Sequence, residues 1–355
     1  MNLIDLGWDD EFAQLFTNHN TQNLTPARIA RVDRNQCLLY SELGAITAEI
    51  TGKFRHEIVE RADFPTVGDW VAVELIPAED KGMIHAVLPR RSKFSRKLKG
   101  DTTEEQILAS NIDKIFIVNG LDEDYNIRRI ERYLTLAWNS GAEPVIILNK
   151  SDICPDLEEV IAEVYAIAFD TPIIPLSAVE NTGFDELHEH LQKGKTSAFI
   201  GSSGVGKSSI INRLIGEDRQ KVKAVRAWRQ RGQHTTTSRE MIFGDEFGIM
   251  IDSPGMRELQ LWADDESLST SFEDIEELAK FCRFRDCKHL NEPGCAVLRA
   301  VENDELDADR YESYVKQLKE LKYLERKQDY HARKQEEQRW KNIKKSHRKQ
   351  DKKRN

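Results

Sequence analysis

Apolar and polar residues alternate with a period of about two between residues 24 and 89, where turn residues separate five short runs. This alternation is typical of strands with one buried face, and several such strands in succession predict a small β-barrel. An OB-type barrel is the leading interpretation, and an SH3-like barrel is the alternative. Residues 1–22 precede the barrel and predict an amphipathic helix followed by a loop. The five runs read ARIARVD, QCLLYSE, AITAEIT, DWVAVELI and GMIHAVL.

The pattern changes after a polar linker at 97–106. Continuous apolar runs such as KIFIVNG and PVIIL then alternate with segments of helical periodicity such as NIRRIERYLTLAWNSG. Strands that alternate with helices predict a mostly parallel α/β sheet. From about residue 268 the pattern is helical. We therefore predict a multidomain α/β chain with three domains: a helix plus barrel at 1–96, an α/β domain at 97–266 and a helical domain at 267–355.

Composition and length fit a globular protein of several domains. The chain has 355 residues, of which 39% are hydrophobic and 32% charged. No apolar run reaches the roughly 18 residues that a membrane-spanning helix needs, so we expect no membrane association. The first residues, MNLIDLGWDDEFAQLF, are acidic and do not have the basic start of a signal peptide. We therefore expect the protein in the cytoplasm, and we expect it to be a monomer.

Charge is unevenly distributed along the chain. The net charge is -9, yet residues 321–355 contain 14 Lys and Arg against 5 Asp and Glu, so this tail carries +9 and the rest carries -18. A second basic run, RRSKFSRKLK at 90–99, has six Lys and Arg and no acid. An acidic body with two basic regions indicates a polyanionic partner, with a solvated charged helix as the alternative for the tail.

Residues 201–208 read GSSGVGKS and match the phosphate-binding pattern G-x-x-x-x-G-K-[ST] in full. A strand-like run precedes the match and a helical run follows it, which is the context that this loop requires. Backbone N–H groups of such a loop face a phosphate, the Lys reaches the β- and γ-phosphates, and the hydroxyl ligates Mg²⁺. The predicted nucleotide contacts are Gly201, Ser202, Ser203, Gly204, Val205, Gly206, Lys207, Ser208 and Ser209, with Mg²⁺ at Ser208.

Asn149, Lys150 and Asp152 form an N-K-x-D sequence directly after the apolar run PVIIL. A carboxylate at Asp152 can accept from both guanine N1–H and the guanine 2-amino group. Adenine offers no such pair of donors and would leave the carboxylate unpaired, so the sequence favours GTP and GDP over ATP. Ser177 and Ala178, in LSA about 25 residues later, fit the loop that supports the base through a backbone N–H.

The sequence IDSPG at 251–255 follows another apolar run. Asp252 fits the carboxylate that organises Mg²⁺, and Gly255 fits the amide that meets the γ-phosphate. Between the phosphate loop and this sequence lies RGQHTTTSRE, in which Thr236, rather than Thr235, is expected to complete the Mg²⁺ shell. Position 256 is Met, where many small GTPases place a Gln that orients the attacking water. His234 is the best local candidate for that task.

The order of these motifs is unusual for a GTPase. The base-reading motif and its support precede the phosphate loop, whereas GTPases ordinarily begin with that loop. This order is a circular permutation, which preserves a packed sheet when the original termini lie close together. The catalytic set predicted for the permuted domain is His234, Thr236 and Lys207.

Three of the five cysteines cluster near a histidine, as Cys282-x₄-Cys287-x-His289-x₅-Cys295. In a chain expected in the cytoplasm such a cluster indicates a metal rather than disulfides. Three thiolates and one imidazole form a closed tetrahedral Zn²⁺ set, so the predicted role is structural. Cys37 and Cys154 stand apart from this cluster and from each other.

With these motifs in place, the sequence resembles the small-ribosomal-subunit-dependent GTPase A family, RsgA, also called YjeQ. The resemblance covers nearly the whole chain and rests on the permuted order, RGQHTTTS, DSPGMRE, the cysteine–histidine spacing, VGDWVAVE, LPRRSKFSRK and QILASNIDKIFIV. It implies an N-terminal OB domain that binds RNA, a permuted GTPase domain and a C-terminal zinc domain.

The resemblance also implies a function in late maturation of the 30S subunit, with 16S rRNA and the subunit as partners and with slow GTP hydrolysis that the subunit stimulates. It supports His234 as the catalytic histidine and Thr236 as the switch threonine. Gln233 departs from the basic residue expected before that histidine. Two alternatives stay open: a GTP-switched RNA or protein adaptor with little turnover, which Met256 motivates, and a GTPase that acts on another RNA.

Overall fold

The computed structural model describes residues 2–19, 23–34, 36–76, 81–97, 105–168, 170–217, 240–244, 247–252, 265–324 and 326. The predicted residues Gln233, His234, Thr236, Gly255 and Met256 lie outside this part of the chain, as does most of the basic tail. Among the described residues, none of the helices combines the length and the apolar character needed to cross a bilayer.

The N-terminal part is a closed five-stranded barrel. It consists of β1 (Thr25–Val32), β2 (Cys37–Ser41), β3 (Gly44–Ile50), β4 (Trp70–Ile76) and β5 (Lys81–Val87). The strand order is 1-2-3-5-4, β1 also pairs with β4, and β3 runs parallel to β5 while the other pairs are antiparallel. This closure is OB-like, so the leading interpretation is confirmed over the SH3-like alternative. A short helix, α2 (Gly52–Glu57), follows β3 and was not predicted.

The segment before the barrel is helical over a shorter stretch than predicted. A 3₁₀ turn at Ile4–Leu6 ends at Gly7 in the left-handed region, and α1 covers only Asp10–Phe16, followed by a 3₁₀ turn at Thr17–His19. Asp9 begins α1 by accepting from the N–H of Phe12 at 3.1 Å, which is an ordinary N-cap. The aromatic side chains of this segment pack together against Trp70 of the barrel.

The central part is the predicted α/β sheet. Five parallel strands, β8 (Lys114–Gly120), β9 (Glu143–Asn149), β10 (Ile173–Leu176), β11 (Thr196–Ile200) and β13 (Gly248–Asp252), are joined by the antiparallel strand β12 (Glu240–Gly244) in the order 10-9-8-11-13-12. The helices are α3 (Ile127–Ser140), α4 (Leu157–Ala168), α5 (Phe184–Glu189) and α6 (Lys207–Glu217).

Both faces of this sheet are buried, which explains why its strands read as continuous apolar runs. In β8, Ile115 and Ile117 lie in the core that α3 and α4 cover. Their neighbours Phe116 and Val118 lie in a second core, which includes Leu187 of α5 and residues of α6. The alternation of side chains across the sheet therefore divides one apolar run between two cores.

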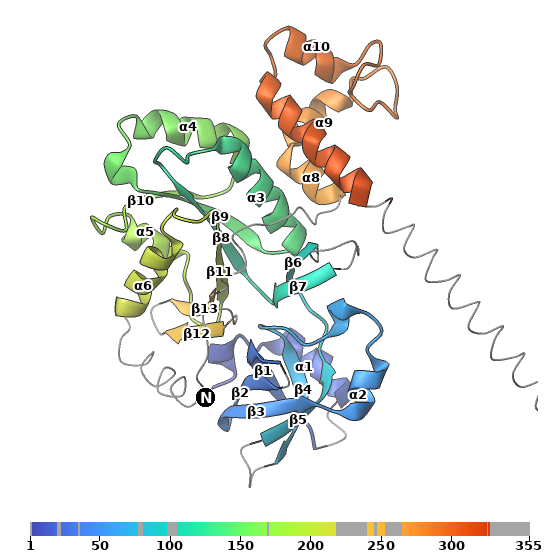
Figure 1. The fold of residues 1–355 in the computed structure, drawn as a ribbon, viewed down its shortest axis with the longest axis vertical. Coiled ribbons are helices and arrows are strands. Elements are labelled where there is room, and N and C mark those ends of the chain that lie inside the picture. Colours follow the sequence, from blue (N-terminus) through green and yellow to red (C-terminus); the bar gives the residue numbers. More distant parts are fainter. Residues whose placement is uncertain are drawn as a thin grey trace, which may run out of the picture.

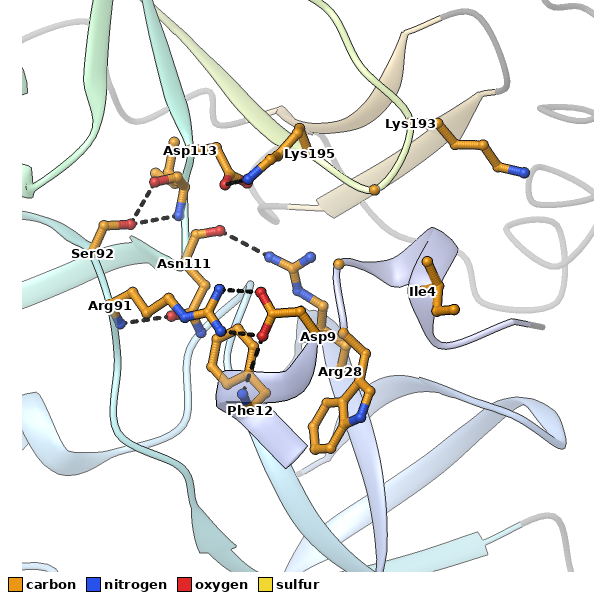
Figure 2. Close-up of a pocket in the computed structure, with 14 residues that line it drawn as sticks. Ile4, Asp9, Phe12, Arg28, Arg91, Ser92, Asn111, Asp113, Lys193 and Lys195 are labelled. Carbon is orange, nitrogen blue, oxygen red and sulfur yellow. Dashed lines mark hydrogen bonds and ion pairs between the residues drawn. The ribbon is translucent and has the colours of Figure 1, made fainter. Parts of the chain in front are cut away.

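The barrel and the α/β sheet are joined at the buried side chain of Arg28, which is 2% exposed. Its guanidinium donates to the carbonyls of Gly68 at 3.2 Å, Asn111 at 2.9 Å and Leu6, and to the hydroxyl of Thr196 at 2.8 Å. Burial lowers the pKa of Arg28 to about 10. A cavity of about 250 Å³ lies beside it (Figure 2). Arg28 thus ties the barrel to the first residue of β11.

Much of the basic run at 90–99 has a structural role in this fold. Its strand β6 (Lys93–Lys97) pairs with β7 (Glu105–Ser110), so a hairpin crosses the predicted boundary between residues 96 and 97. Arg90 binds Asp69 through two nitrogens, at 2.7 and 2.8 Å. Further pairs join Arg91 to Asp9, Lys93 to Glu105 and Arg96 to Gln106. These four basic side chains are therefore partnered within the chain.

The C-terminal part is helical, as predicted, with α8 (Asp265–Ser271), α9 (Glu273–Ala279), α10 (Ala296–Glu302) and a helix at 308–324. Figure 1 shows these helices beside α3, at the end of the molecule away from the barrel. The buried Arg310 donates to Glu131 of α3 at 2.8 Å and to Asp274 of α9 at 2.6 Å. Ion pairs thus join the C-terminal helices to the α/β part, and a further one links Arg132 of α3 to Glu320.

Candidate nucleotide-binding site and metal centre

The predicted phosphate loop connects β11 to α6, which begins at Lys207. Gly201, Gly204 and Gly206 have φ values of 144°, 86° and 98°, a region that side chains disfavour. A Cβ at position 201 would lie 2.2 Å from the carbonyl oxygen of Val118, and one at position 206 would lie 2.1 Å from Nδ2 of Asn149. At Gly201 and Gly206, a side chain is therefore excluded both by a neighbouring atom and by the backbone conformation.

The ammonium of Lys207 lies inside this loop and donates to the carbonyls of Gly201, at 2.7 Å, and Ser202. Ser208 and Ser209 are exposed in the first turn of α6. The loop, the cation and the helix N-terminus thus meet at the carboxyl end of β11, and such an arrangement attracts an anion.

The side chain of Asn149, at the end of β9, is buried between two other loops. Its Nδ2 donates to the carbonyl of Val205 in the phosphate loop at 2.8 Å. Its Oδ1 accepts from the N–H of Ala178 at 3.1 Å. One amide therefore holds together the three segments that were predicted to contact the nucleotide.

The loop at Ser177 and Ala178 is itself fixed by local bonds. Ser177 is fully buried, its Oγ accepts from the N–H of Glu180 at 3.0 Å, and its backbone pairs with Thr182. Gly183 closes the turn with a φ of 79°, where a Cβ would lie 2.2 Å from the carbonyl oxygen of Pro175. The backbone amides of this loop are therefore held in one arrangement.

Lys150 and Asp152 follow Asn149 in a tight turn. Lys150 has a left-handed backbone, with a φ of 66°, and its ammonium forms an ion pair with Asp122. Asp152 lies in the 3₁₀ turn Ser151–Ile153 and is exposed. The lysine is therefore held by a partner from the loop after β8, while the carboxylate of Asp152 faces solvent.

Asp252 ends β13, which lies next to β11 in parallel register. Its backbone is therefore at the same edge of the sheet as the phosphate loop, because parallel strands end at a common edge. The remaining predicted contacts, His234, Thr236 and Gly255, lie outside the described residues.

The predicted metal ligands come together in the C-terminal part. One ligand atom each of Cys282, Cys287, His289 and Cys295 lies within 4.8 Å of the others. Backbone N–H groups donate to the sulfurs of Cys282, at 3.3 Å, and Cys295, at 3.4 Å. Burial raises the pKa of Cys282, but backbone N–H donors, led by that of Ala296, and hydrogen bonds with the neighbouring thiols outweigh it, so the net shift is downward. Three thiols and one imidazole at this spacing suit a tetrahedral ion that prefers sulfur and nitrogen.

The position of His289 is fixed by its backbone. Its φ is 56°, and its carbonyl accepts from the hydroxyl of Tyr311 at 2.5 Å, so the last long helix supports the loop. Cys37 lies elsewhere, buried in the barrel, and burial raises its pKa to about 12. Cys37 therefore remains a protonated core residue outside the cluster.

The comparisons with known proteins agree with one another. The family model described as RsgA GTPase matches residues 87–262. A small ribosomal subunit biogenesis GTPase RsgA from Opitutus terrae is 46% identical over 352 residues, which cover 97% of this chain and 96% of that protein. The chain belongs to the RsgA GTPase family.

Two solved structures are similar to this RsgA-family chain. YjeQ from Thermotoga maritima superposes with a TM-score of 0.64 at 28% identity, covering 84% of this chain and 98% of that one. YloQ, described as a circularly permuted GTPase, has a TM-score of 0.60 at 25% identity, covering 86% and 97%. Together with the sheet order, these matches confirm the permuted α/β fold and identify the chain as a GTP hydrolase.

Sequence reasoning missed Asp122, which lies two residues after the end of β8 and pairs with Lys150 in this RsgA-family structure. A weak signal was present, because Asp122 comes two residues after the apolar run KIFIVNG, and Asn149 directly follows the run PVIIL. Carboxyl ends of neighbouring parallel strands meet at one edge, so an acid there could have been expected near the site.

Proposed function

We propose that this GTPase binds the small ribosomal subunit through 16S rRNA and hydrolyses GTP during a late step in maturation of that subunit. The observation that carries the proposal is the contact of Asn149 with both Val205 and Ala178, which brings the three segments predicted to bind the nucleotide together in permuted order. Similarity to a protein named as a small ribosomal subunit biogenesis GTPase over nearly the whole chain supports the choice of partner.

The proposed nucleotide contacts are those that the sequence motifs predict. The amides of 201–206, the Lys207 ammonium and the start of α6 bind the phosphates. Asp152 accepts from guanine N1–H and the 2-amino group, while Lys150 packs along the plane of the base. Ser177 and Ala178 support the base from the other side. Adenine nucleotides are rejected because Asp152 would then be unpaired in the complex.

Hydrolysis requires that water attack the γ-phosphate, whose developing charge the loop amides and Lys207 stabilise. We propose that His234 positions this water and that Gly255 contributes its amide. Ser208 and Thr236 would hold Mg²⁺, with Asp252 organising its shell, and the ion would neutralise charge on the phosphate oxygens when bound. Because Met256 has no hydrogen-bonding side chain for water, turnover without the subunit is expected to be slow.

The outer parts are proposed to contact RNA, with residues 1–96 and 267–355 as separate domains around the GTPase domain at 97–266. The ions proposed are one structural Zn²⁺ at Cys282, Cys287, His289 and Cys295, and Mg²⁺ with GTP. We further propose that the chain acts as a monomer in the cytoplasm. Contacts with RNA should weaken with salt, since phosphate neutralisation releases counterions.

The test is steady-state GTP hydrolysis with and without purified 30S subunits, with His234→Ala as the control variant. Stimulation by 30S that the variant loses would support both the partner and the role of His234. Absence of stimulation despite tight GTP binding would favour an adaptor. Competition with 50S subunits or tRNA that abolishes the stimulation would favour another RNA as the partner.

A further inference from the structure

Asp122 lies beside the base-reading motif because of the pairing of β8 with β9. The register places Gly120 opposite Asn149, and the N–H of Leu121 donates to the carbonyl of Asn149 at 2.8 Å. The chain of β8 is therefore paired with the chain of β9 up to the residue before Lys150. The residue after Leu121 is Asp122, and its carboxylate forms an ion pair with the ammonium of Lys150.

The ion pair is partly exposed, with 27% of the Lys150 side chain and 31% of the Asp122 side chain accessible. The hydrogen bond from Lys150 is the main reason why the pKa of Asp122 is lowered, so the carboxylate is charged at neutral pH. Gly120 makes room for the pair, since a Cβ there would lie 3.0 Å from Oδ1 of Asp122 and 3.5 Å from Cε of Lys150.

We propose that Asp122 is a positioning residue for guanine recognition, which acts through Lys150. This inference rests on the proposed function, in which Lys150 packs along the base and Asp152 reads its edge. Held by Asp122, the Lys150 ammonium already has a partner before nucleotide binds. Without that partner, the entropy cost of ordering the Lys150 side chain would be part of nucleotide binding. The affinity would then be lower by roughly three- to tenfold.

Asp122 also determines which acid Lys150 neutralises. Lys150 and Asp152 are two residues apart in one tight turn, so an unpartnered ammonium could pair with the carboxylate that reads guanine. With Lys150 bound to Asp122, the exposed Asp152 carboxylate stays available for N1–H and the 2-amino group. Loss of Asp122 should therefore reduce the preference for guanine over hypoxanthine, which differs by the 2-amino group.

The same loop offers a matched control. Asp124 is two residues away, is 51% exposed and pairs with Arg129 at 2.6 Å, outside the base-reading motif. Exposed ion pairs contribute little to stability, so Asp122→Ala and Asp124→Ala should lower the unfolding temperature by similarly small amounts. Nucleotide binding should separate them, which a merely structural role for Asp122 would not do.

The experiment measures Kd for GDP and IDP with full-length protein, for wild type, Asp122→Ala, Asp124→Ala, Lys150→Ala and the double variant Asp122→Ala/Lys150→Ala. We expect Asp122→Ala to weaken GDP about three- to tenfold and to lower the GDP-to-IDP preference, while Asp124→Ala stays within about twofold of wild type. In the Lys150→Ala background, removing Asp122 should have no further effect.

Unchanged GDP binding by Asp122→Ala, or an effect of the same size in the Lys150→Ala background, would overturn the proposal while leaving the GTPase function intact. Wild-type protein that failed to bind GDP would overturn the proposed function and this inference with it. The two failures are thus separated by the behaviour of the wild type alone.

Discussion

The side-chain amide of Asn149 donates to the carbonyl of Val205 at 2.8 Å, although the two residues are 56 positions apart and the donor comes first in the chain. β9, which ends at Asn149, and β11, which leads into the phosphate loop, lie on either side of β8 and end at the same edge of the sheet. The contact between Asn149 and Val205 depends on this shared edge and not on which of the two strands comes first in the sequence. The permuted order of motifs is therefore compatible with an ordinary guanine-nucleotide site.

Asn149→Ala should weaken GDP binding, because the phosphate loop and the Ala178 loop would lose their common partner. The variant also leaves the buried Val205 carbonyl without this donor, which should cost ~1–3 kcal/mol. If that whole cost falls on the binding step, the Kd for GDP should rise up to about hundredfold. Fluorescence titration with labelled GDP measures the loss. Asn212→Ala, at an exposed position of α6, is the matched control and should bind GDP as wild type does. Equal affinities for the two variants would contradict this prediction.

Gly206→Ala should abolish nucleotide binding. The new Cβ would lie 2.1 Å from Nδ2 of Asn149 at a φ of 98°, so the loop, the amide or both must move. Gly216→Ala in α6 is the control, because a Cβ there meets nothing within 4 Å and should stabilise the helix by ~0.5–1 kcal/mol. Calorimetric titration with GDP checks the first variant and thermal unfolding the second. Retained binding by Gly206→Ala would show that the contact with Asn149 is dispensable.

The metal centre predicts that each chain holds one ion of Zn²⁺. Elemental analysis of purified protein should give a ratio near one, and a strong chelator should lower it together with the helical signal of the C-terminal part, because ligand binding and folding of such a loop are coupled. Cys295→Ser should have the same effect. Cys154→Ser, at a half-buried residue away from the cluster, should retain the ion. Full metal content in Cys295→Ser would argue against this ligand set.

The barrel, the α/β sheet and the phosphate loop could be predicted because each depends on local patterns. Alternation, apolar runs and glycine spacing are properties of short segments, and the same holds for the cysteine–histidine cluster. The N-terminal helix was overestimated because two local signals overrode its periodicity, namely the left-handed Gly7 and the N-cap Asp9. Likewise Phe272, with non-helical backbone angles, separates α8 from α9 in the region where the pattern indicated helix.

Long-range partners could not be predicted from those patterns. The basic run at 90–99 indicated a surface for a polyanion, yet Arg90 folds onto Asp69, whose side chain is fully buried. In the sequence, Arg28 is one polar residue of a predicted strand, and nothing indicates its hydrogen bond to Thr196. Such pairs depend on how the barrel and the sheet are oriented to each other. No spacing within either segment contains that information.

The last prediction concerns Arg310, whose side chain is 5% exposed and which joins the C-terminal helices to α3. Arg310→Met would leave Glu131, fully buried, with Arg128 as its remaining ion-pair partner. Removing one member of a buried ion pair costs ~3–5 kcal/mol, so the free energy of unfolding in urea should fall by about that amount. Arg129→Met, which breaks an exposed pair with Asp124, should cost less than ~1 kcal/mol.

The double variant Glu131→Leu/Arg310→Met separates the ion pair from the packing of the helices. Replacing both charges by apolar side chains removes the buried carboxylate that has lost one of its two arginine partners, so the double variant should be more stable than Arg310→Met alone. Protease cleavage between α3 and the C-terminal helices should therefore be faster in Arg310→Met than in the double variant. If Arg310→Met proved as stable as Arg129→Met, the ion-pair cluster around Arg310 would contribute nothing measurable. The attachment of the C-terminal part would then rest on its other contacts with α3, namely the packing of α8 and the pair of Arg132 with Glu320.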